Sequence, residues 1–133
     1  ASGTERIYSL YGDVICSALK RDGMAGVVSD NGCRDIADIE ALGLPVFGKA
    51  TVQYGPPKNF IRPVAGNVPV ICGGAEVRPG DLVAADGDGV IVMPKESLVE
   101  LEKAVIAHQA KEDNIRERIH NGEPLKTAYP KAD

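Results

Sequence analysis

Short apolar segments separated by Gly, Pro and Asn turn signals make up most of this chain, which restricts it to a layered fold of short elements. The first segment has helical spacing and predicts a helix that begins at Gly12-Asp13 and stops at Gly23. Its apolar residues are Leu10, Val14, Ile15, Ala18 and Leu19. A buried strand over 25–29 follows and ends at the Asn31-Gly32 turn signal. A short helix over 35–42 comes next, and this alternation predicts a βαβ-like α/β arrangement.

The second half predicts strands and then one long helix. Residues 45–54 are expected to be extended, 55–59 to form a loop because of two prolines, and 64–93 to be rich in strands. The expected turns there are Gly73-Gly74, Pro79-Gly80 and the run 86–89. A helix over 97–120 would carry a favourable Glu112–Arg116 pair and an apolar face of Leu98, Leu101, Val105, Ile115 and Ile119. Residues 122–133 are expected to be a polar tail that wraps a neighbour or frays.

Length and composition fit one cytoplasmic globular domain over residues 1–133. Apolar residues make up 44% and charged residues 26%, which are ordinary globular values. A net charge of −4, without a run of Lys or Arg, argues against a nucleic-acid surface. The first residues lack the pattern of a secretory signal, and three cysteines without a C-x-x-C pair are typical of reduced thiols. Of these, Cys33 is interpreted as a packing residue.

The pair Arg34-Asp35 is the first candidate for chemistry. It follows a buried strand and a turn, where α/β proteins place ligand sites. Arg offers a planar fork that suits a carboxylate or an enolate oxygen, and Asp is a hard oxygen ligand for Mg²⁺. Local sequence leaves a plainer alternative open, in which Asp35 is a helix N-cap and Arg34 is solvated.

Gly12-Asp13 is the second candidate. If a helix begins here, the amides of Val14 and Ile15 lack helical acceptors and can bind a substrate carboxylate. Asp13 would then hold or orient a water molecule on a metal ion. A simple helix cap remains the alternative.

The other polar features are interpreted as structural. Gly87-Asp88-Gly89 lacks the spacing of an EF-hand and predicts a hairpin turn, and Gly73-Gly74 lacks the Lys-Ser or Lys-Thr of a phosphate loop. His108 and His120 lie on the predicted long helix without an evident metal-ligand partner, which predicts surface histidines. No glycine-rich S-adenosylmethionine loop follows a first strand, which disfavours a methyltransferase.

Together these segments resemble the family of 4-hydroxy-4-methyl-2-oxoglutarate and 4-carboxy-4-hydroxy-2-oxoadipate aldolases, which also holds the RNase E regulator (RraA-like) proteins. The strongest element is an Asp-x20-Arg-Asp signature, met by Asp13 and, after twenty intervening residues, Arg34-Asp35. Asp38 fits the acidic residue that follows in the family. The supporting blocks are AGVVSDNGCRD, LGLPVFGKA, NVPVICGG and VRPGDLVAADGDGVIVMP. Family members usually carry a further N-terminal region, so a truncated or clipped chain, or a second polypeptide that supplies this part, is expected.

The resemblance implies a layered α/β sandwich of the swivelling β/β/α type with a long C-terminal helix. It implies trimers or hexamers with sites between protomers. Asp35 would bind Mg²⁺ or Mn²⁺ directly, and Asp13 would bind it through water. Glu112 of a neighbouring protomer is the candidate that completes the metal shell, also through water.

The resemblance also implies how the substrate binds. Arg34 would pair with the oxygen that becomes the enolate, and Gly12 with the amides of Val14 and Ile15 would hold the pyruvyl carboxylate. The implied activity is that of a class II aldolase, a carbon–carbon lyase of aromatic-compound degradation that releases pyruvate from 4-hydroxy-2-oxo diacids. Oxaloacetate decarboxylation is the expected side activity. The alternative is a binding protein that docks on a ribonuclease without chemistry.

Overall fold

The computed structural model describes residues 6–129 of this 133-residue chain. The chain divides into two compact units, Ala1–Pro94 and Lys95–Asp133. The organisation of residues 1–133 as a single domain stays a prediction. The mixed α/β composition and the long C-terminal helix are confirmed.

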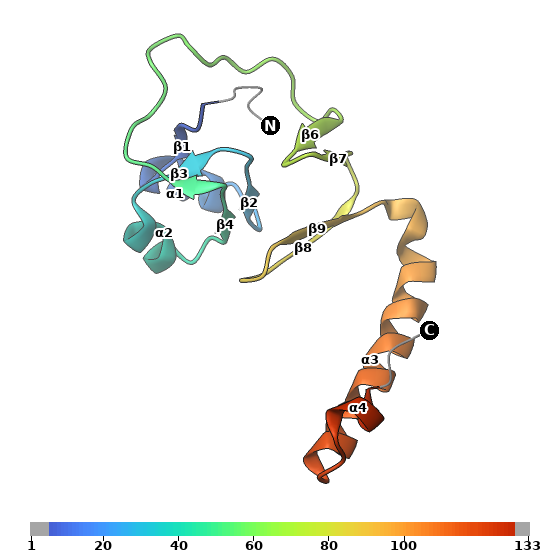
Figure 1. The fold of residues 1–133 in the computed structure, drawn as a ribbon. Coiled ribbons are helices and arrows are strands. Elements are labelled where there is room, and N and C mark those ends of the chain that lie inside the picture. The colour runs from blue at the N-terminus through green and yellow to red at the C-terminus, as the bar shows by residue number, and fades with distance from the viewer. Residues whose placement is uncertain (1–5, 130–133) are drawn as a thin grey trace. The chain divides into compact units, whose positions relative to one another are not determined.

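Short parallel strands and two helices open the N-terminal unit (Figure 1). One sheet has the order β1-β3-β5, and a second pairs β2 with β4; all of these pairings are parallel. The strand bounds are β1 Ser9–Tyr11, β2 Val27–Val28, β3 Gly32–Cys33, β4 Val46–Phe47 and β5 Ala50–Thr51. Helices α1, Asp13–Arg21, and α2, Ile36–Leu42, lie in the connections between parallel partners, as the predicted βαβ-like order requires.

The two helices pack against each other and bury a small core (Figure 1). Its members are Cys16 of α1, Val27 of β2, Ile39 of α2, and Leu44. Each helix begins and ends close to the predicted position, since Gly12 is the N-cap of α1 and Gly43 in the left-handed region ends α2. The ends of these helices therefore lie at the glycine and aspartate residues that the sequence marks.

Two local predictions are wrong. Leu10 lies in β1 and not on the first helix, because β1 pairs in parallel with β3 as far as Tyr11. Asn31-Gly32 is not a turn, since Gly32 is a residue of β3. A Cβ on Gly32 would lie 2.5 Å from Val52 Cγ2, so the glycine serves the close approach of strands rather than a reversal of the chain.

Two antiparallel hairpins complete the N-terminal unit, and the predicted β-rich region and its turns are confirmed. Strands β6, Val70–Cys72, and β7, Ala75–Val77, join through Gly73-Gly74, both with positive φ, as a tight two-residue hairpin turn demands. Strands β8, Leu82–Ala85, and β9, Val90–Met93, join through residues 86–89, where the amide of Asp88 donates to Asp86 Oδ1 at 2.9 Å.

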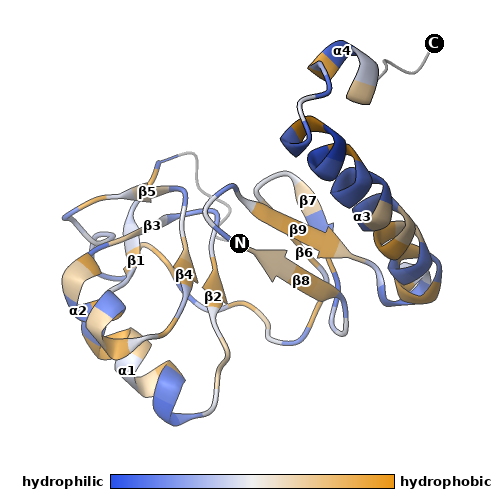
Figure 2. Ribbon diagram, turned by 90° about the horizontal axis from the view of Figure 1, so that it is seen from below, coloured by the Kyte–Doolittle hydropathy of each residue, from blue (hydrophilic) through white to orange (hydrophobic). Residues whose placement is uncertain are grey.

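Many of the apolar side chains on these hairpins are exposed, although the strands are hydrophobic in sequence (Figure 2). Ile71 is 58% exposed, Leu82 51% and Ile91 64%. Apolar side chains exposed in such number are typical of a surface that further protein covers. Within residues 6–129, no helix combines the length and apolarity needed to span a bilayer.

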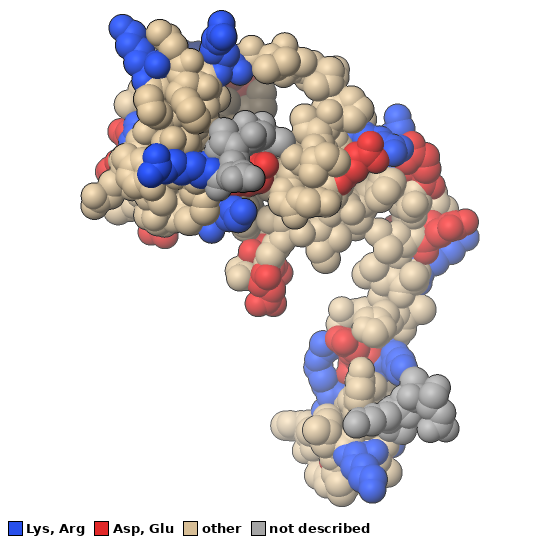
Figure 3. All heavy atoms as spheres, turned by 45° about the horizontal axis from the view of Figure 1, so that its top comes forward, with Lys and Arg blue, Asp and Glu red and all other residues tan. Residues whose placement is uncertain are grey.

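The C-terminal unit is a long helix with a short helix folded back on it. After the 3-10 turn η1, Lys95–Ser97, helix α3 covers Leu98–His120 and α4 covers Leu125–Ala128. On the face drawn in Figure 3, acidic and basic side chains lie interspersed along this unit. The predicted apolar face of α3 is largely open, since Val105 is 57% exposed and only Ile115 is buried.

Residues 122–129 do not fray, which contradicts one of the two expectations for the tail; the other, that the tail wraps a neighbour, stays a prediction. Arg118 reaches across the turn and pairs with Glu123, with Nε 2.7 Å from Oε2 and Nη2 2.5 Å from Oε1. Its guanidinium also donates to the carbonyls of Thr127 and Ala128, which are at the end of α4. Ala128 is fully buried. Residues 130–133 of the predicted tail lie outside the described part of the chain.

Candidate active site

Parallel pairing of β1 with β3 brings together the residues that follow each strand. Gly12-Asp13 follows β1 and starts α1, whereas Arg34-Asp35 follows β3 and leads into α2. The Arg34 amide donates to the Tyr11 carbonyl at 3.0 Å and fixes the two chains at this edge. Since parallel neighbours end at the same edge, both halves of the predicted signature meet there.

The carboxylate of Asp35 is the centre of this cluster. Its Oδ2 lies 3.3 Å from Arg34 Nε and accepts a long hydrogen bond of 3.4 Å from the Asp13 amide. Asp35 is also the N-cap of α2 and has a left-handed backbone, with φ 57° and ψ 42°. This conformation is uncommon for a residue other than glycine, although aspartate tolerates it better than most. The Arg34 and Asp35 side chains are 41% and 34% exposed, so a ligand can reach them.

Gly12 makes this arrangement sterically feasible. A Cβ at Gly12 would lie 2.6 Å from Asp35 Oδ2 and 3.3 Å from Arg34 Nε. Its φ of −135° and ψ of −178° are open to any residue, so the glycine is required for space and not for conformation. Sequence reasoning predicted Gly12 as a helix start and substrate contact; its role in admitting the carboxylate emerges only in the structure.

The first turn of α1 presents the amides predicted to bind a substrate carboxylate. No side chain caps the helix at Gly12, so the amides of Val14 and Ile15 lack intrahelical acceptors. The side chains of Val14 and Ile15 are 75% and 45% exposed, so they leave this end of the helix open. The Asp35 carboxylate beside the Asp13 amide already uses part of the positive potential of the helix end.

The donor set suits a hydrated Mg²⁺ or Mn²⁺ ion. No group of three or more His, Cys, Asp or Glu side chains that could hold a metal occurs in the described range 6–129. Mg²⁺ commonly binds through one or two carboxylates and keeps several waters, which the exposed Asp35 and the half-buried Asp13 can support. The residues therefore fit this class of ion, and their role as its ligands stays a prediction.

Two further acidic residues of the predicted set lie apart from these contacts. Asp38 is exposed in the first turn of α2. Glu112 belongs to α3 in the other unit, and its carboxylate contacts Arg116 Nη2 at 2.5 Å and His108 Nε2 at 3.1 Å. His108 thus has a carboxylate neighbour, which its spacing of four residues from Glu112 could have indicated. The place of Glu112 in the metal shell of another protomer stays a prediction.

Sequence reasoning missed Ser9, which contacts Arg34. The Ser9 residue is 2% exposed, and its hydroxyl accepts a hydrogen bond from Arg34 Nη1 at 3.3 Å. No spacing rule links a serine to an arginine 25 residues later, so the sequence carries no signal for this contact.

The cysteines near the cluster are packing residues. Cys33 is 7% exposed, and burial raises the pKa of its thiol. The pKa of Cys16 is also raised, first by burial and then by Cys33 and Asp13. Both thiols stay protonated at neutral pH, which agrees with the interpretation of Cys33 as a packing residue.

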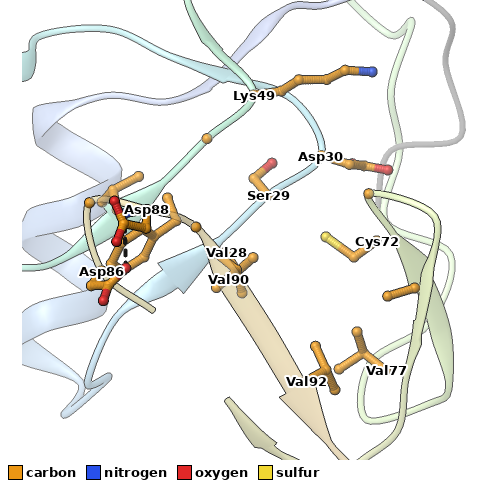
Figure 4. Close-up of a pocket in the computed structure, with 17 residues that line it drawn as sticks. Val28, Ser29, Asp30, Lys49, Cys72, Val77, Asp86, Asp88, Val90 and Val92 are labelled. Carbon is orange, nitrogen blue, oxygen red and sulfur yellow. Dashed lines mark hydrogen bonds between the residues drawn. The ribbon is translucent and has the colours of Figure 1, made fainter. Parts of the chain in front are cut away.

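A large open hollow of about 680 Å³ lies elsewhere in the N-terminal unit (Figure 4). Valine side chains from β2, β7 and β9 form much of its wall, and charged groups of Asp30, Lys49, Asp86 and Asp88 stand along it. None of Asp13, Arg34 and Asp35 lines this hollow. Asp13, Arg34 and Asp35 are therefore candidates because of the chemistry of their groups and not because of a cavity around them.

Comparison with known proteins places this chain in a family. The family model described as RraA-like, Aldolase/RraA, matches residues 1–92. A Halalkalibacterium halodurans protein provisionally named 4-hydroxy-4-methyl-2-oxoglutarate aldolase is 38% identical over 110 residues, which are 83% of this chain and 51% of that protein.

Two solved structures share the fold. An uncharacterized protein from Pseudomonas syringae superposes with a TM-score of 0.81 at 29% identity, over 91% of this chain and 60% of that one. Streptomyces coelicolor RraAS2, described as an unusual member of the RNase ES inhibitor RraA protein family, gives a TM-score of 0.77 at 34% identity, over 89% and 59%. The chain spans about half the length of the curated relatives it matches. With its signature residues gathered at one sheet edge and this model matched over residues 1–92, the chain belongs to the RraA-like aldolase/RraA family.

Proposed function

We propose that the cluster of Asp13, Arg34 and Asp35 is the active site of a divalent-metal-dependent aldolase that releases pyruvate from 4-hydroxy-2-oxo diacids. Suitable substrates are 4-hydroxy-4-methyl-2-oxoglutarate and 4-carboxy-4-hydroxy-2-oxoadipate. The observation that carries this proposal is the seating of the Asp35 carboxylate between Arg34 Nε and the Asp13 amide, over a glycine that leaves room for it. The provisional aldolase name of the Halalkalibacterium halodurans relative supports the reaction class.

The reaction is a retro-aldol cleavage. A proton passes from the 4-hydroxyl group to a water molecule, the C3–C4 bond breaks as C4 becomes a carbonyl carbon, and the electron pair of that bond passes to the C2 carbonyl oxygen. The products are the enolate of pyruvate and a carbonyl compound, and a proton returned by water to C3 of the enolate then gives pyruvate. The Arg34 guanidinium binds and stabilises this oxygen as its negative charge develops. The amides of Val14 and Ile15 hold the adjacent carboxylate and orient the substrate.

Asp35 would hold Mg²⁺ or Mn²⁺ directly, and Asp13 would do so through water. When bound, such an ion supplies positive charge that lowers the energy of the enolate. Oxaloacetate decarboxylation passes through the same enolate and is the expected side activity. The exposed apolar side chains of the hairpins support a homo-oligomer, a trimer or hexamer, in which Glu112 of another protomer completes the metal shell.

Replacement of Arg34 tests the assignment. Arg34→Ala is expected to lower pyruvate release by at least about 10²-fold, the usual loss when an oxyanion partner is removed. Arg34→Lys is expected to restore little, because an ammonium lacks the planar fork. A coupled pyruvate assay on 4-hydroxy-4-methyl-2-oxoglutarate and on oxaloacetate measures both.

Arg21→Ala is the matched control, because Arg21 forms an exposed pair with Asp22 on α1. It should retain wild-type rates. Full activity in Arg34→Ala would show that Arg34 is not the enolate partner.

The similarity to RraAS2 favours a second candidate function, a protein that binds a ribonuclease and blocks it without chemistry. Ribonuclease inhibition together with no EDTA-sensitive pyruvate release would reverse the ranking of the two functions.

A further inference from the structure

Ser9 is a buried serine of β1 whose hydroxyl lies against the Arg34 guanidinium. The hydroxyl accepts from Arg34 Nη1 at 3.3 Å and donates to the Tyr11 carbonyl at 3.3 Å. A buried hydroxyl needs such partners. Because its proton points to Tyr11, its lone pairs are directed at Arg34, and the acceptor is oriented before any ligand arrives.

The Arg34 guanidinium is thereby held at two points. Asp35 Oδ2 lies 3.3 Å from Nε, and Ser9 Oγ lies 3.3 Å from Nη1. The backbone of the loop that follows β5 also lies beside the Arg34 guanidinium, since a Cβ built on Gly55 would lie 3.7 Å from Nη1. An arginine has five N–H donors in a rigid plane, so anchoring two of them fixes where the others point.

The backbone of β1 does not depend on this hydroxyl. The Ser9 amide donates to the Tyr54 carbonyl, and the Arg34 amide donates to the Tyr11 carbonyl, each at 3.0 Å. Both bonds join main-chain atoms, so Ser9→Ala removes neither of their partners. Removal of the hydroxyl therefore subtracts an anchor of the guanidinium and leaves the strand pairing intact.

We infer that Ser9 is a positioning residue for the proposed aldol cleavage. Its hydroxyl holds the Arg34 guanidinium in the orientation in which the remaining N–H groups point at the enolate oxygen. This inference rests on the proposed function. Ser9→Ala keeps the positive charge of Arg34 but leaves the orientation of its guanidinium less fixed, so it lowers kcat more than it raises KM. The expected loss is about tenfold, smaller than for Arg34→Ala, because misorientation removes only part of the stabilisation.

A double-mutant cycle on pyruvate release is the test. Ser9→Ala should lower kcat about tenfold beside an intact Arg34 and cause no further loss in the Arg34→Ala protein, since residues that act through one group are not additive. Equal losses in both backgrounds, or no loss in the first, overturn the inference. Ser29→Ala is the matched control: it removes a hydroxyl that accepts from the Asn31 amide at 3.1 Å, and its kcat should not change.

A second measurement does not depend on activity. Rotation about the Nε–Cζ bond of Arg34, followed by NMR of the side-chain N–H groups, should be faster in Ser9→Ala than in wild type or Ser29→Ala. Unchanged rotation overturns the positioning role. Absence of pyruvate release from the wild-type protein would instead reject the proposed function, and the NMR result would still decide whether Ser9 orients Arg34. Ser9→Cys, a weaker acceptor of similar shape, gives the same comparison should Ser9→Ala fail to fold.

Discussion

Gly12 leaves the space that the Asp35 carboxylate occupies beside the start of α1. The atom that a Cβ would meet, Asp35 Oδ2, is the end of a side chain and can swing away. The backbone at Gly12 is extended, so alanine causes no strain there. Space at this residue thus governs the position of the carboxylate more than it governs folding.

Gly12→Ala is therefore expected to separate activity from stability. Displacement of the Asp35 carboxylate should lower pyruvate release by at least about tenfold, whereas the free energy of unfolding should change by less than about 1 kcal/mol. Thermal unfolding and the pyruvate assay measure the two effects. Gly66→Ala is the control, because nothing lies within 4 Å of a Cβ built there, and it should leave both quantities unchanged. Unaltered activity in Gly12→Ala would contradict the role given to this contact.

At the level of residues, the sequence predicted which charged groups lie together better than which residues contact them from other strands. Resemblance singled out Asp13, Arg34 and Asp35 by their spacing, and the structure brings them to one edge. Ser9 was beyond reach, because its contact with Arg34 depends on parallel pairing of β1 and β3, which no local pattern records.

Among the elements, the short helix α4 is held against α3 by hydrogen bonds from Arg118. Arg118 holds Glu123 before α4 and two carbonyls at its end. The hydrogen bond from Arg118 is the main reason that the pKa of Glu123 lies below its ordinary value of 4.5. A lowered carboxyl pKa means that this contribution to stability is present above the unfolded-state pKa and is lost as the pH falls through the folded-state value.

Glu123→Gln, or acidification through the lowered pKa of Glu123, should loosen α4 from α3. Amide hydrogen exchange at Ala128 should become faster, because Arg118, which bonds the Ala128 carbonyl, is itself held by Glu123. Glu117→Gln is the control, since Glu117 lies exposed on the same helix. Equal protection of Ala128 in Glu123→Gln and wild type would show that the Arg118–Glu123 pair does not hold α4.

The elements that the sequence predicted are those whose ends or turns carry characteristic residues. Helices α1, α2 and α3 and both hairpins were foreseen, since Gly, Asp and Ser mark their ends or turns. Strand β1 was mistaken for part of a helix, because Leu10 continues the helical spacing. Helix α4 has four residues and is stabilised by Arg118 rather than by its own pattern, so sequence reasoning could not find it.

On the scale of the whole molecule, the chain belongs to the RraA-like aldolase/RraA family and has its mixed α/β fold. The chain matches about half the length of its curated relatives, and its hairpins expose many apolar side chains. The proposed activity depends most on one carboxylate, because Asp35 is the proposed direct ligand of the metal.

Metal-dependent pyruvate release tests that claim most directly. Protein stripped with EDTA should lose activity on 4-hydroxy-4-methyl-2-oxoglutarate and regain it as Mg²⁺ or Mn²⁺ is added. Asp35→Asn should remain at least about 10²-fold less active at saturating metal, whereas Asp22→Asn, a change to the exposed partner of Arg21, should behave as wild type. Pyruvate release that is indifferent to EDTA, or that survives undiminished in Asp35→Asn, would contradict the account.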